Sequence, residues 1–172
     1  PRRALALQAL GVGGVVIDGQ WLPAIDGDRR AVALFERHYS CDLEGRRKRQ
    51  AKLFVQPGEK MVLLTLECDA LFVWVKNRVE RWDKQTGVNC AVFRNESPHL
   101  ASDLIREACQ IAWGKWPGER LFTYVDHSKI RKKRDPGRCF LRAGWRPCGE
   151  SKENKLLIFE CLPEWMEIDR VA

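Results

Sequence analysis

The sequence predicts one α/β domain in which helices pack against a largely antiparallel sheet. Its 172 residues are enough for a single core of ordinary size. The middle of the chain holds three short apolar runs separated by turn residues, as expected of an antiparallel meander. A longer stretch with apolar residues at helical spacing follows, and further strand-like runs come after it.

The first 30 residues mix glycines with isolated apolar side chains and show no sustained period. We expect residues 1–30 to form an N-terminal arm, with one strand near 15–17, and residues 31–172 to form the domain. A short helix is predicted from Arg30, because Val32, Leu34 and Phe35 follow it. That helix should lead into His38 and a basic, exposed loop over 45–52.

The meander is predicted from strands at 61–66, 70–76 and 88–94. Ser97 and Pro98 are typical of a helix N-cap and first helical position, so the main helix should begin there and end near Gly114 or Trp116. A strand at 121–125 should come next, then a basic turn or short helix at 127–134. A segment at 139–143 and a final strand at 155–160 complete the predicted order.

Composition excludes several protein classes. With 45% hydrophobic and 31% charged residues, the chain does not have the profile of a disordered protein. The longest apolar run, residues 4–17, is interrupted by Gln8 and falls short of the roughly 20 residues that span a bilayer. The seven cysteines are odd in number and contain no CxxC pair, which argues against a secreted disulfide scaffold. We therefore expect a cytoplasmic protein with no membrane association.

The order of meander, long helix, strand, short helix and terminal hairpin resembles the fold of the GNAT superfamily of N-acetyltransferases. The residues that carry this resemblance are Phe140, Gly144 and Trp145. In that superfamily an aromatic residue near the end of the last helix, then a small residue, glycine and another aromatic, commonly lead into the final strand pair. The resemblance implies a GNAT-like fold with a central mixed, mostly antiparallel sheet flanked by helices.

A closer resemblance is to Mom-type DNA-modification proteins of phages and prophages, which look like divergent GNAT folds. The matching segments are residues 35–40, 89–97, 121–126, 136–140 and 143–145. This resemblance implies an enzyme that replaces a hydrogen on adenine N6 with a carbamoylmethyl group, which protects phage DNA from host restriction enzymes. It also implies double-stranded DNA as the partner and the bacterial host cytoplasm as the location.

One departure concerns the cofactor. The usual GNAT pyrophosphate loop is missing between residues 94 and 104, which puts ordinary acetyl-CoA transfer in doubt. Backbone N–H groups at a helix N-terminus still favour an anion, so Arg94, Asn95 and Glu96 are the candidate cofactor-binding residues. Glu96 is also a candidate general base or metal ligand, although a carboxylate at that place is equally explained by the helix dipole.

The candidate metal ligands are His38, Tyr39 and Asp126, because imidazole, phenolate and carboxylate suit a nitrogen-and-oxygen iron site. Iron is the metal that the Mom resemblance implies. Asp126 and Tyr124 share one face of a predicted strand that ends at the split in a GNAT-like sheet. The competing interpretation is structural: His38 packs or caps a helix, Tyr39 is half-buried, and Asp126 caps the next helix.

Tyr39, Tyr124, Asp126 and Ser97 are the candidate catalytic residues. The chain has only two tyrosines against seven tryptophans and seven phenylalanines, which makes their two hydroxyls candidates for a role beyond burial of the ring. Ser97 has a competing role as the cap of the main helix. Base chemistry inside a duplex requires extrusion of the nucleotide, usually with aromatic stacking. The candidate stacking residues are Trp74, Trp82, Trp113, Trp116 and Trp145, although core packing explains most of them.

Basic residues form two clusters, and the net charge is +7. The nucleic-acid-binding candidates from these clusters are Arg46, Arg47, Lys48, Arg49, Lys129, Arg131, Lys132, Lys133, Arg134 and Arg138. Such clusters contact phosphates and supply affinity without sequence information. The alternative is a solvated loop whose charge is balanced elsewhere by acids.

Three functions follow as hypotheses. The first is DNA adenine modification. The second is an acyl-CoA-dependent N-acetyltransferase in which the turn at residues 94–97 binds pyrophosphate and Tyr124 acts as general acid. The third is a DNA-binding module without catalysis. The donor of the transferred group is left open, and so is the oligomeric state, with a homodimer as one alternative.

Overall fold

A computed structural model describes residues 19–129 and 135–168. The strands of its sheet are β1 (Trp21–Ala24), β2 (Glu59–Thr65), β3 (Ala70–Lys76), β4 (Val88–Asn95), β5 (Leu121–Val125), β6 (Arg146–Glu150) and β7 (Leu157–Cys161). The helices are α2 (Arg29–Glu36), α3 (Leu43–Lys48), α4 (Ala101–Lys115), η1 (His127–Lys129), α5 (Arg138–Arg142) and α6 (Pro163–Ile168). No helix within these residues is long and apolar enough to cross a membrane.

The strands form one seven-stranded sheet in the order β1-β2-β3-β4-β5-β7-β6. Every neighbouring pair is antiparallel except β4 and β5, which run parallel. This arrangement confirms an α/β domain with a mixed, mostly antiparallel sheet. The parallel pair arises because α4 carries the chain back to the edge at which β4 began, as a crossover between parallel strands requires.

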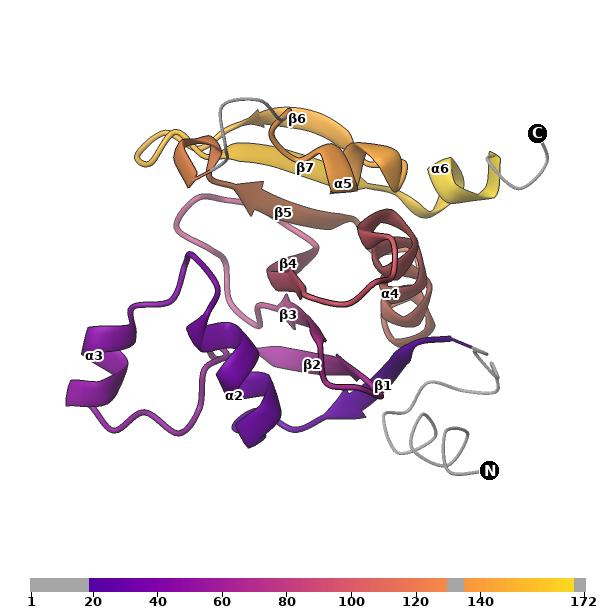
Figure 1. Cartoon of the computed structure of the whole chain (residues 1–172). Helices are drawn as coiled ribbons and strands as arrows, with labels where there is room; N and C mark the ends of the chain where they lie inside the picture. The colour runs from indigo at the N-terminus through magenta and orange to yellow at the C-terminus, as the bar shows by residue number, and fades with distance from the viewer. Residues whose placement is uncertain (1–18, 130–134, 169–172) are drawn as a thin grey trace.

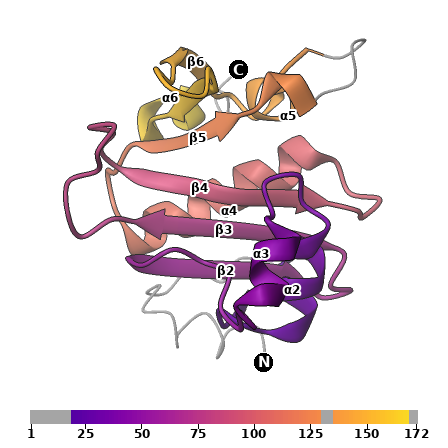
Figure 2. The ribbon, with the colours of Figure 1, turned by 90° about the vertical axis from the view of Figure 1, so that its left-hand side faces the viewer.

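Helices cover both faces of the sheet, so the protein has three layers (Figures 1 and 2). α4 and α5 lie on one face, over a core that includes Phe72, Trp74 and Trp145. α2 packs on the other face, where Leu34 lies among Val62 and Val73. Because both faces are covered, β3 is buried along nearly its whole length and lacks the alternation of a half-exposed strand.

α4 forms where the helical spacing predicts it. Its buried residues are Leu104, Ile105, Ala108, Cys109, Ile111 and Ala112. Two indole N–H groups reach its backbone: Trp21 Nε1 donates to the Leu104 carbonyl at 2.8 Å, and Trp74 Nε1 donates to the Ala108 carbonyl at 3.2 Å. A buried indole needs an acceptor for its N–H, so these two bonds fix how α4 lies on the sheet.

The predicted start of α4 is wrong. The helix begins at Ala101 with Leu100 as its N-cap and no side-chain cap. Ser97 instead belongs to a turn in which Asn95 Oδ1 accepts from the Ser97 backbone N–H at 2.9 Å and from the Ser97 hydroxyl at 2.6 Å. The Asn95 side chain holds this turn outside the helix, so Pro98 also precedes the first helical position.

The predicted arm needs two further corrections. β1 lies inside residues 1–30, its Trp21 is only 2% exposed, and its register pairs Trp21 with Thr65 of β2. Asp28 accepts from the Arg30 backbone N–H at 2.9 Å and caps α2. The folded part therefore includes residues before 31, while the strand expected near 15–17 lies outside the described residues. Part of the predicted basic loop at 45–52 is helical, because α3 begins at Leu43 after the Asp42 cap and ends at Lys48.

β4 and β5 pair only over their first residues, and this split creates the site. The register runs from Val88–Leu121 to Cys90–Thr123 and then stops, although β4 continues to Asn95. The Thr123 hydroxyl donates to the Cys90 carbonyl at 3.0 Å and closes the paired part. Directly beyond it, Ala91 is the extra residue of a β-bulge against β3. The two strands therefore diverge at Ala91.

Candidate functional site

Two adjoining cavities open where β4 and β5 diverge. The larger has a volume of about 560 Å³ and is lined by His38, Tyr39, Ser40, Ala91, Tyr124, Asp126, His127, Ser128, Asn154, Lys155 and Leu156. The smaller, about 170 Å³, reaches deeper between the strands and shares His38, Tyr39, Ala91 and Tyr124. The larger volume lies within the range of about 300–1,000 Å³ that small-molecule sites occupy. Segments far apart in the sequence thus meet at one place.

His38 and Tyr39 line this cavity. They belong to the connection from α2 to α3 (Figures 1 and 2), which an arginine–glutamate cluster anchors. Arg37 donates two hydrogen bonds to the Glu96 carboxylate, at 2.9 and 2.7 Å. Arg94 donates to Glu96 at 2.6 Å and to the Arg37 carbonyl at 2.5 Å. The two guanidinium groups hold the pKa of Glu96 at about 2, so the carboxylate stays ionised.

His38 is a neutral imidazole on the cavity wall. Burial lowers its pKa to about 4, the positive charge of Arg94 adds to this effect, and a backbone hydrogen bond with Phe93 opposes it. Its Nδ1 lies 2.7 Å from the Ser40 hydroxyl oxygen and also accepts from the Ser40 backbone N–H at 3.3 Å. Nδ1 therefore serves as an acceptor, and the Ser40 hydroxyl donates its hydrogen bond to Nδ1.

The Tyr39 ring packs against His38 in a tilted arrangement, with 4.3 Å between ring centroids and 32° between the ring planes. Half of its surface is exposed, so one ring face is open beside the cavity. Burial of the hydroxyl end raises the pKa of Tyr39, while a backbone hydrogen-bonding contribution from Asp126 opposes the rise. The Tyr39 ring is therefore a neutral aromatic surface that spans from α2 toward the end of β5.

Tyr124 projects from β5 and is held by Arg81 and Asp83. Its hydroxyl donates to Asp83 Oδ2, and Arg81 donates two hydrogen bonds to Asp83 at 2.9 and 2.8 Å. Burial first, and the Asp83 carboxylate second, raise the pKa of Tyr124 to about 12. Its proton is given to Asp83, and its oxygen accepts from Arg81 at 3.4 Å, so only its remaining lone pair is left, as an acceptor, for a molecule in the cavity.

Asp126 lies at the end of β5 and caps η1. One carboxylate oxygen, Oδ1, accepts from the Ser128 backbone N–H at 2.9 Å and from the Ser128 hydroxyl at 2.6 Å. These hydrogen bonds lower the pKa of Asp126 and keep it ionised. The structural interpretation of Asp126 as a cap is therefore correct, and the residue also lines the cavity.

Other candidates lie away from this cavity. Arg94 and Glu96 bind each other and Arg37, while Asn95 and Ser97 bind each other, and Asn95 Nδ2 also donates to the His99 carbonyl at 2.9 Å. The turn at residues 94–97 is therefore occupied with internal contacts that connect β4 to α2 and α4. None of its four residues lines the cavities described here.

The resemblance implies an iron ion, but few side chains are available to bind it in the cavity where β4 and β5 diverge. Within residues 19–129 and 135–168, no three His, Cys, Asp or Glu side chains gather so that they could hold a metal ion. His38 and Asp126 line one cavity, but His38 Nδ1 and Asp126 Oδ1 both bind serine hydroxyls. We derive no chemical step through a metal.

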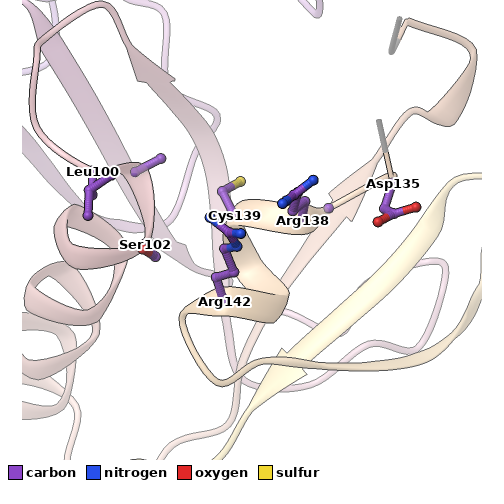
Figure 3. A pocket seen from close by; sticks show the side chains of 8 residues that line it. Leu100, Ser102, Asp135, Arg138, Cys139 and Arg142 are labelled. Carbon is purple, nitrogen blue, oxygen red and sulfur yellow. The ribbon is translucent and has the colours of Figure 1, made fainter. Parts of the chain in front are cut away.

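A third cavity of about 490 Å³ lies between the start of α4 and α5 (Figure 3). Leu100, Ala101 and Ser102 form the α4 side. Arg138 and Arg142 come from α5, and Figure 3 shows Arg142 on the side of α5 that faces α4. An uncapped helix N-terminus with two arginines suits an anionic group. Asp135 lines the same cavity, so its charged side chains are two arginines and one carboxylate.

The basic clusters are used in different ways. Arg46 is buried, donates to the Leu53 and Ala51 carbonyls at 2.9 and 3.1 Å, and holds the chain after α3 in place. Arg47, Lys48 and Arg49 are exposed, and the last two pair with Glu44 and Asp42. Lys129 is exposed at the cavity end of η1, and Arg138 is exposed on α5. The remaining candidates, Arg131, Lys132, Lys133 and Arg134, lie outside the described residues.

Sequence reasoning missed Ser40, Arg81, Asp83 and Lys155. Ser40 follows Tyr39 directly, and the short spacing of His38 and Ser40 in a turn was the available signal. Arg81 and Asp83 gave no such signal, because their loop precedes β4 and reaches Tyr124 only through the parallel pairing of β4 with β5. Lys155 comes from the hairpin between β6 and β7, which folds over the same cavity.

A comparison with models of known protein families and a search of curated proteins both find no match.

Proposed function

We propose that this protein modifies adenine in DNA at N6, by carbamoylmethylation on a GNAT-like fold, and so protects phage DNA from restriction. The observation that carries the proposal is the cavity at the split of β4 and β5. Four of the site candidates named from the sequence line it, and they come from two segments far apart in the chain: His38, Tyr39, Tyr124 and Asp126. The strand order and its one parallel pair agree with the element order of the GNAT resemblance.

The cavity suits an amino-bearing base. The Tyr124 oxygen accepts only, because its own proton goes to Asp83. Asp126 is ionised, and its Oδ2 has no hydrogen-bond partner among the described residues. An adenine extruded from the duplex presents two N6 hydrogens to such acceptors, and the open face of Tyr39 can stack on its ring.

The chemistry assigned to this cavity is an attack by adenine N6 on the methylene carbon of a carbamoylmethyl donor. A bond forms between N6 and that carbon, the bond from the carbon to the donor's leaving group breaks, and one N6 proton is released. The Ser40 hydroxyl can take this proton while its own passes to His38 Nδ1, 2.7 Å away. His38 is available as an acceptor because it is neutral.

The basic surface supports DNA as the partner. Lys129 lies at the end of η1, directly after the cavity residues His127 and Ser128. Arg47 is exposed on α3, at the other end of the connection that carries His38. Lys129 and Arg47 would thus be available to contact the phosphates on either side of an extruded nucleotide.

The test is nucleoside mass spectrometry of DNA from iron-replete bacteria that express the protein. We expect a deoxyadenosine heavier by one carbamoylmethyl group with wild type and a loss of this product with His38→Ala. His99→Ala is the matched control, because no described cavity includes His99, and it should retain the product. Absence of the product with folded wild-type protein would refute the proposal.

A second function has one observation in its favour. The cavity between α4 and α5, with Arg138 and Arg142, has the charge for the phosphates of an acyl-CoA. In that case the protein would be an N-acetyltransferase. Stoichiometric acetyl-CoA binding that Arg138→Ala weakens, together with an acetylated product, would favour this function over DNA modification.

A further inference from the structure

A fourth cavity lies on the other side of Tyr124 from the proposed adenine site. Its volume is about 360 Å³, and Trp82 and Tyr124 line it together with residues of the hairpin between β6 and β7. Tyr124 also lines the 560 Å³ cavity, so this one side chain separates the two spaces. In a ligand with two linked groups, one group can fill the 560 Å³ cavity while the adjacent group enters the 360 Å³ cavity.

Trp82 is held out of the core by the residues on either side of it. Arg81 and Asp83 bind each other at 2.9 and 2.8 Å, and their side chains are only 14% and 11% exposed. The Arg81 guanidinium lies 5.7 Å from the centroids of both Phe122 and Tyr124. Both neighbours thus turn inward onto β5, and the Trp82 side chain between them is 68% exposed.

This exposure sets Trp82 apart from the other tryptophans. The chain has seven, all within the described residues, and Trp82 alone is among the exposed large hydrophobic side chains. A single exposed apolar residue needs no explanation by itself. Here, however, a buried ion pair fixes an indole at the wall of a cavity, and that combination favours a stacking role.

The charges around the cavity favour an uncharged ligand with polar edges. Two lysines, Lys84 and Lys152, and three carboxylates line it, Asp83, Glu150 and Glu153. Arg81 pairs with Asp83, so the remaining two positive and two negative side chains balance. A phosphate would meet carboxylates there, whereas a nucleobase can stack on the indole and offer amino groups to Glu150. Base–aromatic stacking is tolerant of sequence because every base has a π-face.

From these contacts we propose that the Trp82 cavity holds a nucleobase adjacent in the DNA to the adenine being modified. The inference rests on the proposed function, since it takes the adenine site as its neighbour. Trp82 stacks on the flanking base, and the Arg81–Asp83 pair holds the indole in place. Two bases are thereby removed from the duplex stack, one on each side of Tyr124.

The test is a binding cycle that removes each stacking partner in turn. The probe is a labelled duplex whose target strand contains one adenine, made either intact or with a single abasic site at each flanking position. Wild type should lose at least about 5-fold in affinity when one particular flanking base is absent, as expected for a lost base stack. Trp82→Ala should bind intact DNA more weakly by a similar factor and bind the abasic duplex equally well.

Two variants serve as controls. Trp82→Phe retains a ring and should retain most of the discrimination. Val79→Ala changes another exposed apolar side chain of the same loop, 78% exposed and outside the cavity, and should behave as wild type. If Trp82→Ala and wild type lose the same affinity at every abasic position, the inference is wrong. Because this readout is binding alone, it is independent of whether any modified adenine is formed.

Discussion

At the residue scale, the proposed preference for an amino-bearing base depends on the Tyr124 hydroxyl. Its proton is donated to Asp83, and Arg81 keeps Asp83 ionised by lowering the pKa of that carboxyl. The tyrosine oxygen therefore offers a lone pair and no proton. The proposed preference for an amino-bearing base thus depends on Arg81 and Asp83, which do not themselves line the proposed adenine cavity.

The pKa of Tyr124 can be measured directly because the chain has only two tyrosines. In a Tyr39→Phe background, ultraviolet titration of phenolate should give a pKa of about 12. Asp83→Asn removes the second-largest cause of the rise and should bring the pKa down toward the ordinary value of 10.0, while burial keeps it above that value. An unchanged pKa in Asp83→Asn would mean that the Tyr124–Asp83 bond is not formed.

His38 makes stability depend on pH. Its pKa of about 4 in the folded protein lies below the ordinary 6.5, so the unfolded chain binds more protons between these values. The free energy of unfolding should therefore be highest above pH 6.5 and should fall as the pH is lowered toward 4, by at most about 3 kcal/mol from this group. His38→Phe keeps a partly buried ring and should lack this part of the pH dependence in urea unfolding. Equal slopes for both proteins would contradict a neutral, partly buried His38.

At the scale of elements, the chain at the start of α5 approaches β7 closely beside the split of β4 and β5. Gly137 precedes α5 with φ +70°, and a Cβ there would lie 2.5 Å from the Phe159 ring. Gly137 also lines both the smaller strand-split cavity and the cavity between α4 and α5. A residue without a side chain is required for α5 to close over the sheet at this point.

Gly137→Ala should therefore destabilise the protein more than the same change at a glycine without close neighbours. Gly118 is the matched control, because its φ is +75° and no other atom lies within 4 Å of the place that a Cβ would take. Gly118→Ala should cost about 1 kcal/mol from backbone strain, and Gly137→Ala about 2 kcal/mol or more, because the Phe159 ring must also move. Equilibrium urea unfolding measures both, and equal losses would show that α5 is not packed against Phe159 in this way.

The local sequence pattern predicted the bounds of some elements better than those of others. β3 and β5 have the predicted bounds, and the apolar spacing of α4 matches its buried face. The start of α4 was missed because Asn95 holds Ser97 in a turn before the helix. β1 was missed because Trp21–Ala24 is a four-residue strand whose identity depends on pairing with β2, a contact that the local sequence does not encode.

The site was predictable only in part, and for a related reason. His38, Tyr39, Tyr124 and Asp126 carry recognisable chemistry, and the split sheet brings them to one cavity. Arg81, Asp83 and Lys155 reach the same region through strand order and a hairpin, so no spacing in the sequence identifies them. The turn at 94–97 had the composition of an anion site, but its side chains bind one another.

At the scale of the whole molecule, three features lie together. The sheet splits beside its one parallel pair, acceptor groups line the opening, and exposed basic residues lie on the segments that form its walls. The proposed adenine cavity at the split and the Trp82 cavity share Tyr124 as a lining residue. A duplex bound across this surface could place two consecutive bases into the protein.

The most direct test is to fill the cavity without removing any of its polar groups. Ala91, the bulge residue of β4, lines both strand-split cavities, so Ala91→Phe should occupy the space of the adenine. The measurement is the fraction of carbamoylmethylated deoxyadenosine in DNA from cells that express each protein, with DNA binding measured alongside. We predict modified adenine with wild type, and none with an Ala91→Phe variant that still folds and binds DNA. Modification by Ala91→Phe at the wild-type level would contradict the assignment of this cavity to the adenine.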